Sequence, residues 1–156
     1  MSNIYKEKWK NLLGDWHRIH PGVKFGENVR IGEGTVIEDG CVVGNNVMIG
    51  HNCVLRPNTI IGNNTKISHF FSSEEGAKIG VGDDTILGPA VVTLDKPPTG
   101  DAKGVTIGKR CFIGASSVLL PGITIGDDVI IGAGSVVTKD CLEPGMYMGT
   151  PCQKVE

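Results

Sequence analysis

Two histidines in this chain occupy matched places in a repeating pattern, three repeats apart. His51 and His69 are each the third residue of a six-residue unit. Imidazole changes its charge near neutral pH, so such a pair could accept a proton from a substrate or bind a metal ion. A catalytic zinc site needs three protein ligands. The places expected above and below the pair, at Glu33, Pro89 and Lys109, supply no third histidine, so the pattern favours proton transfer and predicts no metal site.

The histidines belong to a repeat in which an aliphatic residue recurs every six positions between residues 19 and 142. A period of six fits neither an α-helix nor a single amphipathic strand. It fits short strands separated by tight corners, and the 23 glycines among 156 residues suit those corners because glycine adopts a positive φ at little cost. Three sides of six residues close into a triangular coil of about 18 residues. The sequence therefore predicts an all-β fold, a parallel β-helix of hexapeptide repeats, in which residues three repeats apart are stacked.

The chain divides into three parts within one domain. Residues 1–18 carry aromatic and aliphatic side chains at helical spacing, so we expect a short N-terminal helical cap. Residues 19–142 form the β-helix, and residues 143–156 form a C-terminal tail.

Two interruptions, at 67–81 and 93–107, break the six-residue period. Each is longer than two full repeats, and we expect each to contain two extra residues. The second contains two prolines and two glycines and is expected to be an external loop at about 94–104. Loops on a rigid scaffold often carry function. Asp95 in this loop is therefore a candidate substrate-binding residue.

Composition and charge exclude several classes of partner. The net charge of −2 provides no basic excess to attract nucleic acid, and no apolar run is long enough to cross a membrane. The first residues lack the apolar segment of a secretory signal. Five cysteines without such a signal indicate reduced thiols, and we expect a cytoplasmic protein. Four of the cysteines fall at the fifth place of their repeats and are expected to face the core: Cys41, Cys53, Cys111 and Cys141.

The repeats IGEGTV, IGHNCV, LGPAVV and IGAGSVVTKD resemble those of the hexapeptide-repeat acyltransferases, and the ending EPGMYMGTPCQKV resembles their C-terminal pattern. The resemblance covers residues 19–155 and implies that the β-helix is left-handed. The stretch VGDDTILGPAVVTLDKPP at 81–98 is similar to one in sugar-nucleotide N-acetyltransferases. ISHFF at 67–71 aligns with the segment that carries a functional Asn or His in several of those enzymes, which places the functional position on His69.

This resemblance implies N-acetylation of a nucleotide-linked amino sugar by direct attack of the amine on acetyl-CoA. His69 is then the candidate general base and His51 its supporter. In the family the pantetheine arm of coenzyme A lies in a groove between two subunits of a homotrimer, along Gly-Ala corners of the last coils. The resemblance assigns these corners to Gly114, Ala115, Gly132 and Ala133, and the cations for the coenzyme A phosphates to Arg110, Lys139 and Lys154.

Three alternatives remain open. Sugar O-acetyltransferases that resemble this chain have a His-Pro pair in the external loop, where this chain has Lys96-Pro97, so the sequence favours an amine acceptor. A non-enzymatic β-helix scaffold would need neither the stacked histidines nor the loop. A metal enzyme similar to the γ-type carbonic anhydrases would need a third histidine beside His51 and His69.

Overall fold

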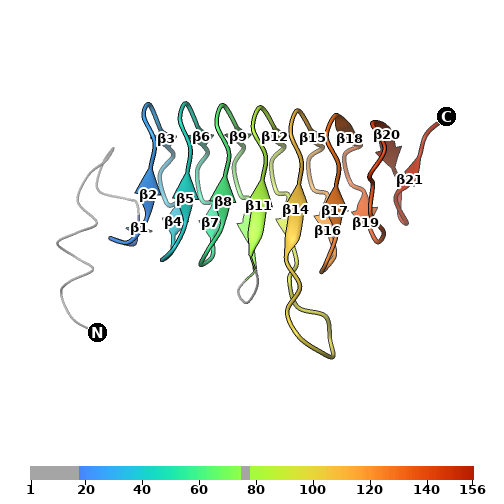
Figure 1. Ribbon diagram of the computed structural model, residues 1–156, viewed down its shortest axis with the longest axis horizontal. Helices are drawn as coiled ribbons and strands as arrows, with labels where there is room; N and C mark the ends of the chain where they lie inside the picture. The colour runs from blue at the N-terminus through green and yellow to red at the C-terminus, as the bar shows by residue number, and fades with distance from the viewer. Residues whose placement is uncertain (1–17, 75–77) are drawn as a thin grey trace.

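The computed structural model describes residues 18–74 and 78–156, and its strands build three parallel sheets that form the sides of a triangular prism (Figure 1). The first sheet contains β1 (Arg18–Ile19), β4 (Val36–Ile37), β7 (Val54–Leu55), β10 (Ser72–Ser73), β13 (Val92–Thr93), β16 (Val118–Leu119) and β19 (Val136–Val137). The second contains β2 (Lys24–Phe25), β5 (Val42–Val43), β8 (Ile60–Ile61), β11 (Ile79–Val81), β14 (Val105–Ile107) and β17 (Thr124–Ile125).

The third sheet contains β3 (Arg30–Ile31), β6 (Met48–Ile49), β9 (Lys66–Ile67), β12 (Ile86–Leu87), β15 (Phe112–Ile113), β18 (Val129–Ile131), β20 (Gly145–Met148) and β21 (Gln153–Lys154). Every pairing is parallel except that of β20 with β21. The described residues thus form a left-handed parallel β-helix of all-β class, which confirms the fold that the repeat predicts.

Each regular coil takes three repeats, so the strands pair with a constant offset. Ile37 pairs with Leu55, and Val118 with Val136. In the two-residue strands from β3 to β19 the second residue points inward, and Ile37, Leu55 and Leu119 are almost completely buried. Stacking these aliphatic side chains removes them from water, which is the main stabilising contribution of a repeat fold that has few aromatic residues.

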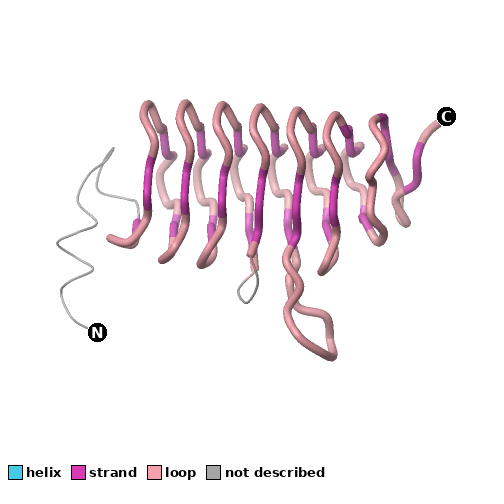
Figure 2. The backbone as a smooth tube through the Cα atoms, viewed as in Figure 1, coloured by secondary structure: helices cyan, strands magenta, loops and turns pink. Residues whose placement is uncertain are grey.

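Three corners join the sheets. The first corner connects the first sheet to the second, the second corner connects the second sheet to the third, and the third corner returns the chain to the first sheet (Figure 2). At the third corner, one residue of each coil has a positive φ, and Gly34 and Gly134 fill this place in the first and last regular coils. Glycine suits that place because it has no Cβ to meet the neighbouring carbonyl oxygen.

Both interruptions lie at the first corner, and the structure corrects the size of the second. Ser72–Ser73 continues the first sheet as β10, so the first interruption begins after it. Leu87 pairs with Ile113, eight positions beyond the regular offset, and residues 94–104 project from the coil between β13 and β14 (Figure 1). This loop therefore adds eight residues to one side of the prism. The expectation of two extra residues was wrong because it assumed that the loop also contained a further repeat.

The cysteines expected to face the core do so. Cys41, Cys53, Cys111 and Cys141 are buried, and all five thiols are free. The expected N-terminal helical cap lies outside the described residues, except for Arg18, which begins β1.

Candidate active site

His51 and His69 lie one above the other at the third corner, as their matched places in the repeat predict. Their rings are stacked, with centroids 5.0 Å apart and planes inclined by 25°. Both side chains are exposed. The pairing of β9 with β12 and of β12 with β15 places Pro89 and then Ala115 above His69. Lys109 was expected in this column but follows β14 at the second corner, because the long loop shifts the register by eight residues.

The two imidazoles accept hydrogen bonds from the backbone of the coil before them. Nδ1 of His51 accepts the N–H of Glu33 at 2.7 Å, and Nδ1 of His69 accepts the N–H of His51 at 2.8 Å. A ring nitrogen that accepts a hydrogen bond carries no proton, so the neutral rings bear their proton on Nε2. Each exposed ring therefore offers an Nε2–H donor at the surface of the corner.

The second corner shows that this hydrogen bond is a structural device of the coil. There Oδ1 of Asn45 accepts the N–H of Glu27, and Oδ1 of Asn63 accepts the N–H of Asn45, each at 2.8 Å. Asp83 and Asp127 repeat the same bond further along. The histidine pair takes the place of these carboxamides and carboxylates at the third corner. Sequence reasoning missed this role, although the matching places of the Asn and Asp residues in their repeats indicate it.

In this column of the third corner, His69 is the last side chain that accepts a hydrogen bond from the backbone of the coil before it. Above it stand Pro89, Ala115 and Ala133, none of which carries a side-chain acceptor. Ala133 therefore cannot accept a hydrogen bond from the N–H of Ala115, whereas His51 accepts one from the N–H of Glu33. A Cβ on Gly114 would overlap the backbone nitrogen of Ala133, so glycine is required there for one coil to lie on the next. The corner thus offers backbone donors flanked by small side chains, which fits an extended ligand with amide groups.

The candidate coenzyme A residues are only partly brought together. Gly114, Ala115, Gly132 and Ala133 share the third corner with the histidines. Lys139 follows β19 at the first corner, and Lys154 lies in β21 with Nζ 5.9 Å from the centre of the Tyr147 ring.

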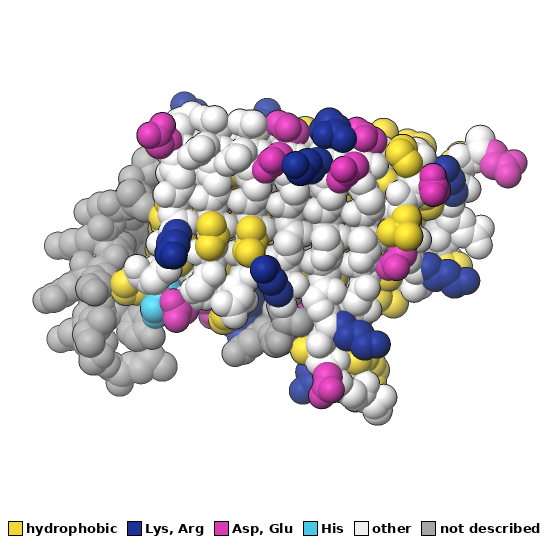
Figure 3. All heavy atoms as spheres, in the orientation of Figure 1, with side chains coloured by type: hydrophobic (Ala, Val, Ile, Leu, Met, Phe, Trp, Pro, Cys, Tyr) yellow, Lys and Arg dark blue, Asp and Glu magenta, His cyan; other side chains and the backbone are white. Residues whose placement is uncertain are grey.

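Arg110 lies at the second corner and is held by an acidic partner. Its Nε and one terminal nitrogen donate to the two carboxylate oxygens of Asp128, at 2.7 and 2.9 Å. The hydrogen bonds from Arg110 lower the pKa of Asp128, and those to Asp128 raise the pKa of Arg110. Figure 3 shows acidic and basic side chains mixed along this edge of the second sheet. Within one chain this guanidinium lies on a different edge from the Gly-Ala corners.

Asp95 follows β13 at the base of the external loop and is completely buried. Its backbone carbonyl accepts the N–H of Lys103 at 2.5 Å, which closes the loop. The first corner, where this loop leaves the coil, and the third corner, where His69 lies, are separated by the width of the first sheet. Asp95 and His69 of one chain therefore do not form a common site.

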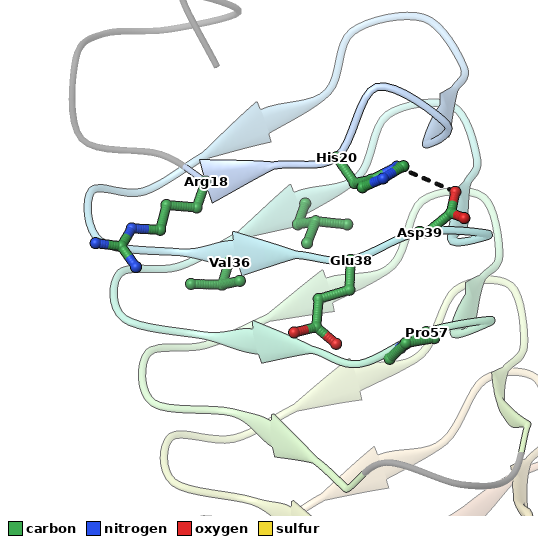
Figure 4. Close-up of a pocket in the computed structure, with 7 residues that line it drawn as sticks. Arg18, His20, Val36, Glu38, Asp39 and Pro57 are labelled. Carbon is green, nitrogen blue, oxygen red and sulfur yellow. Dashed lines mark ion pairs between the residues drawn. The ribbon is translucent and has the colours of Figure 1, made fainter. Parts of the chain in front are cut away.

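A shallow hollow of about 340 Å³ lies on the first sheet near β1 and β4 (Figure 4). It is lined by Arg18, His20, Val36, Ile37, Glu38, Asp39 and Pro57. In Figure 4, Nδ1 of His20 faces Oδ1 of Asp39 at 3.1 Å. Residues 18–74 and 78–156 contain no cluster of three or more His, Cys, Asp or Glu side chains arranged to hold a metal ion. No helix within these ranges could span a bilayer.

Two family models of this repeat match the chain. "Hexapeptide repeat of succinyl-transferase" matches residues 22–51 and 104–139, and "Bacterial transferase hexapeptide (six repeats)" matches residues 40–70. Together these matches cover more than half of the sequence. The chain belongs to the hexapeptide-repeat acyltransferase superfamily.

The chain is similar in sequence to a nodulation protein and in fold to an N-acyltransferase. Nodulation protein L of Rhizobium meliloti (strain 1021) is 44% identical over 87 residues, 49% of this chain and 48% of that protein, so the match spans about half the length of each. A variant of AntD, an N-acyltransferase from Bacillus cereus solved with dTDP and coenzyme A, has a similar fold. Its TM-score is 0.77 at 24% identity, over 85% of this chain and 83% of that one.

Two further structures have higher sequence identity. The maltose O-acetyltransferase of Clostridium difficile 630 is 28% identical with a TM-score of 0.60, over 87% of this chain and 66% of that one. A variant of the GDP-perosamine N-acetyl transferase of Caulobacter crescentus was solved with coenzyme A and GDP-perosamine. It is 26% identical with a TM-score of 0.54, over 90% of this chain and 57% of that one.

Proposed function

We propose that the protein transfers an acetyl group from acetyl-CoA to the amine of a nucleotide-linked amino sugar. The observation that carries the proposal is the composition of the third corner. This one edge of the prism carries the exposed His69 together with Gly114-Ala115 and Gly132-Ala133. Membership of the acyltransferase superfamily supports the reaction class. The Caulobacter crescentus N-acetyl transferase, bound to coenzyme A and GDP-perosamine, supports both substrates.

The reaction needs no covalent intermediate on the protein. The amine nitrogen attacks the thioester carbonyl carbon, the carbon–sulfur bond breaks, and coenzyme A leaves as a thiolate. The amine loses one proton and the thiolate gains one, so the products are an amide and a free thiol. A backbone N–H at a Gly-Ala corner, such as that of Ala115, would stabilise the oxyanion that develops on the carbonyl oxygen.

His69 is the proposed proton acceptor, and the hydrogen bond that it accepts from the His51 N–H sets the cost of that role. Accepting a proton on Nε2 requires the neutral ring to carry its own proton on Nδ1, which removes the hydrogen bond from the His51 N–H. Losing such a bond costs about 1 kcal/mol, which is small beside the barrier of acyl transfer. If Nδ1 keeps the hydrogen bond from the His51 N–H, the Nε2–H of the same ring would instead donate to the acceptor sugar and hold it in place.

We further propose that the protein works as a homotrimer. The outward residues of the third sheet form a continuous apolar stripe: Ile86 pairs with Phe112, Phe112 with Ile130, and Ile130 with Met146, and all four are exposed. Burying such a face against a second copy stabilises a small repeat domain. An interface could also bring Arg110, Lys139 or Lys154 of one copy toward the third corner of another, and the proposal assigns the coenzyme A phosphates to these cations.

Sugar O-acetylation is the second candidate. Of the two solved structures named above with identity over 25%, the maltose O-acetyltransferase has the higher identity, which favours a hydroxyl acceptor. A hydroxyl needs a stronger base than an amine does, because its proton is far less acidic than that of an ammonium group.

A thiol-release assay with acetyl-CoA tests both candidates. The acceptors are nucleotide-linked amino sugars, the matching nucleotide sugars with a hydroxyl in place of the amine, and free maltose. Turnover confined to the amines is the expected result. Turnover with the hydroxyl sugars alone would establish O-acetylation, and no release with any acceptor would refute both functions.

A further inference from the structure

Phe70 has a backbone conformation that disfavours its side chain. Its φ is +62°, the left-handed value that one residue of each coil adopts at the third corner. In the other coils this place holds Gly34, Asn52, Ala90, Ser116 and Gly134, all small or able to bond their own backbone. A bulky residue is an outlier in this region because its Cβ crowds the neighbouring backbone.

The strain at Phe70 is not offset by burial. Its side chain is 59% exposed, more than any other large hydrophobic side chain that the structure describes. The adjacent Phe71 is completely buried, so the core already has its aromatic residue at this corner. The protein loses stability both from the strained backbone of Phe70 and from the exposure of its aromatic ring to water. Such costs persist where the residue contacts a ligand or another chain.

Phe70 lies beside the stacked histidines. Its backbone N–H donates to the carbonyl oxygen of His51 at 3.0 Å, which anchors the residue on the coil that carries the lower ring. His69 immediately precedes it, about 3.8 Å away along the chain, and both side chains are exposed on the same corner. In the next coil the equivalent place holds Ala90, whose side chain is a single methyl group.

We propose that Phe70 binds the acceptor by stacking its ring on the apolar face of the amino sugar, and so determines which sugars are accepted. This inference rests on the proposed function. The reacting amine is attached to the sugar ring, so a side chain one residue from His69 meets that ring, while the nucleobase lies beyond the diphosphate. Aromatic rings provide a large apolar contact surface, and a sugar face that presents C–H groups is the complementary surface. A deoxygenated sugar fits this site better than one with an extra hydroxyl.

The test compares Phe70→Asn and Phe70→Trp with the wild-type protein in the thiol-release assay. Asparagine suits the left-handed conformation, as Asn52 shows one coil below, so the first variant removes the ring and relieves the strain. We expect its KM for the acceptor sugar to rise about tenfold, its KM for acetyl-CoA to stay within about twofold, and its Tm not to fall. Phe70→Trp keeps an aromatic face and should retain a KM close to that of the wild type.

The matched control is Asn52→Gly, at the same place of the corner one coil below, which should leave both KM values unchanged. The preference for a 6-deoxy over a 6-hydroxy amino sugar, as a ratio of kcat/KM, should fall in Phe70→Asn and not in the control. Two results would overturn the inference. One is an acceptor KM that does not change in Phe70→Asn. The other is a parallel rise of both KM values with a loss of oligomer in sedimentation, which would assign Phe70 to a contact between copies. If the wild-type protein itself turns over no acceptor, the proposed function fails first.

Discussion

The backbone N–H of His51 donates a 2.8 Å hydrogen bond to Nδ1 of His69, one coil further along the prism. This bond gives His69 a structural task that is independent of any chemistry, because it satisfies a backbone donor at the third corner. It also fixes the ring so that Nε2 faces outward. The same residue thus stacks the coils and presents a proton-carrying nitrogen at the proposed site.

The structural and chemical tasks of His69 can be separated by two substitutions. In His69→Asn the Oδ1 atom can accept the His51 N–H, as Asn63 accepts that of Asn45 at the second corner. In His69→Ala no acceptor remains. We expect His69→Ala to lose about 0.5–1 kcal/mol of unfolding free energy and His69→Asn to lose much less. Urea denaturation measures both, and equal losses would show that the bond contributes nothing.

We expect acyl transfer to depend on the imidazole of His69 and not on the hydrogen bond between the coils. If His69 accepts the proton or binds the acceptor through Nε2, both variants lose acyl transfer, by about 10²–10⁴-fold for a general base. Full activity in His69→Asn would remove the imidazole from the chemistry while leaving the enzyme assignment intact. The control is Asn63→Ala, which removes the equivalent bond at the second corner and should affect stability only.

The tautomers of both histidines follow from the same geometry. Since Nδ1 of each ring accepts a backbone N–H, the neutral rings must carry the proton on Nε2. Nitrogen-15 NMR at a pH where the rings are neutral should show a pyrrole-like Nε2 and a pyridine-like Nδ1 for both residues. A pyrrole-like Nδ1 on His69 would contradict the hydrogen bond from His51.

The period of six was enough to predict the coil and the stacking of the histidines, because residues three repeats apart must lie one above another in a regular prism. It failed at the external loop, since a loop can hold any number of residues without disturbing the pairing of its flanking strands. The eight residues added there move Lys109 to the second corner. The strain at Phe70 was also missed. Comparison with Asn52 and Ala90 at the same place of the repeat would have indicated it.

The buried threonines offer a paired test of core hydrogen bonding. The Thr85 hydroxyl donates to the Gly108 carbonyl at 2.8 Å and accepts the Cys111 N–H at 3.1 Å. In Thr85→Val both backbone groups lose their partner inside the protein, so we expect a loss of about 1–3 kcal/mol in unfolding free energy. Thr93 is equally buried, but its hydroxyl has no hydrogen-bond partner among the described residues.

Thr93→Val should therefore have the opposite effect. Valine keeps the shape of the side chain and removes a buried hydroxyl that makes no hydrogen bond, so the unfolding free energy should rise by about 1 kcal/mol. Urea denaturation of the two variants side by side is the measurement. A loss of stability in Thr93→Val as large as that in Thr85→Val would mean that the Thr93 hydroxyl is satisfied in solution.

The buried thiols predict a loss of stability at alkaline pH. Burial, reinforced by the neighbouring Cys152, raises the pKa of Cys141 from 9.0 to about 11. Above pH 9 the unfolded chain gives up this proton while the folded protein keeps it, so the folded state binds more protons and stability falls as pH rises. The contribution of Cys141 should be complete below pH 9 and lost progressively between pH 9 and about 11.

The measurement is urea denaturation at several pH values from 8 to 11, with Cys141→Ala as the matched variant. The lysine and tyrosine side chains are the same in both proteins, so their contribution cancels in the difference. Burial also raises the pKa values of Cys41, Cys53 and Cys111, so the variant should decline less steeply than the wild type without becoming independent of pH. Identical slopes in the two proteins would show that the Cys141 thiol titrates in the folded state as it does in the unfolded chain.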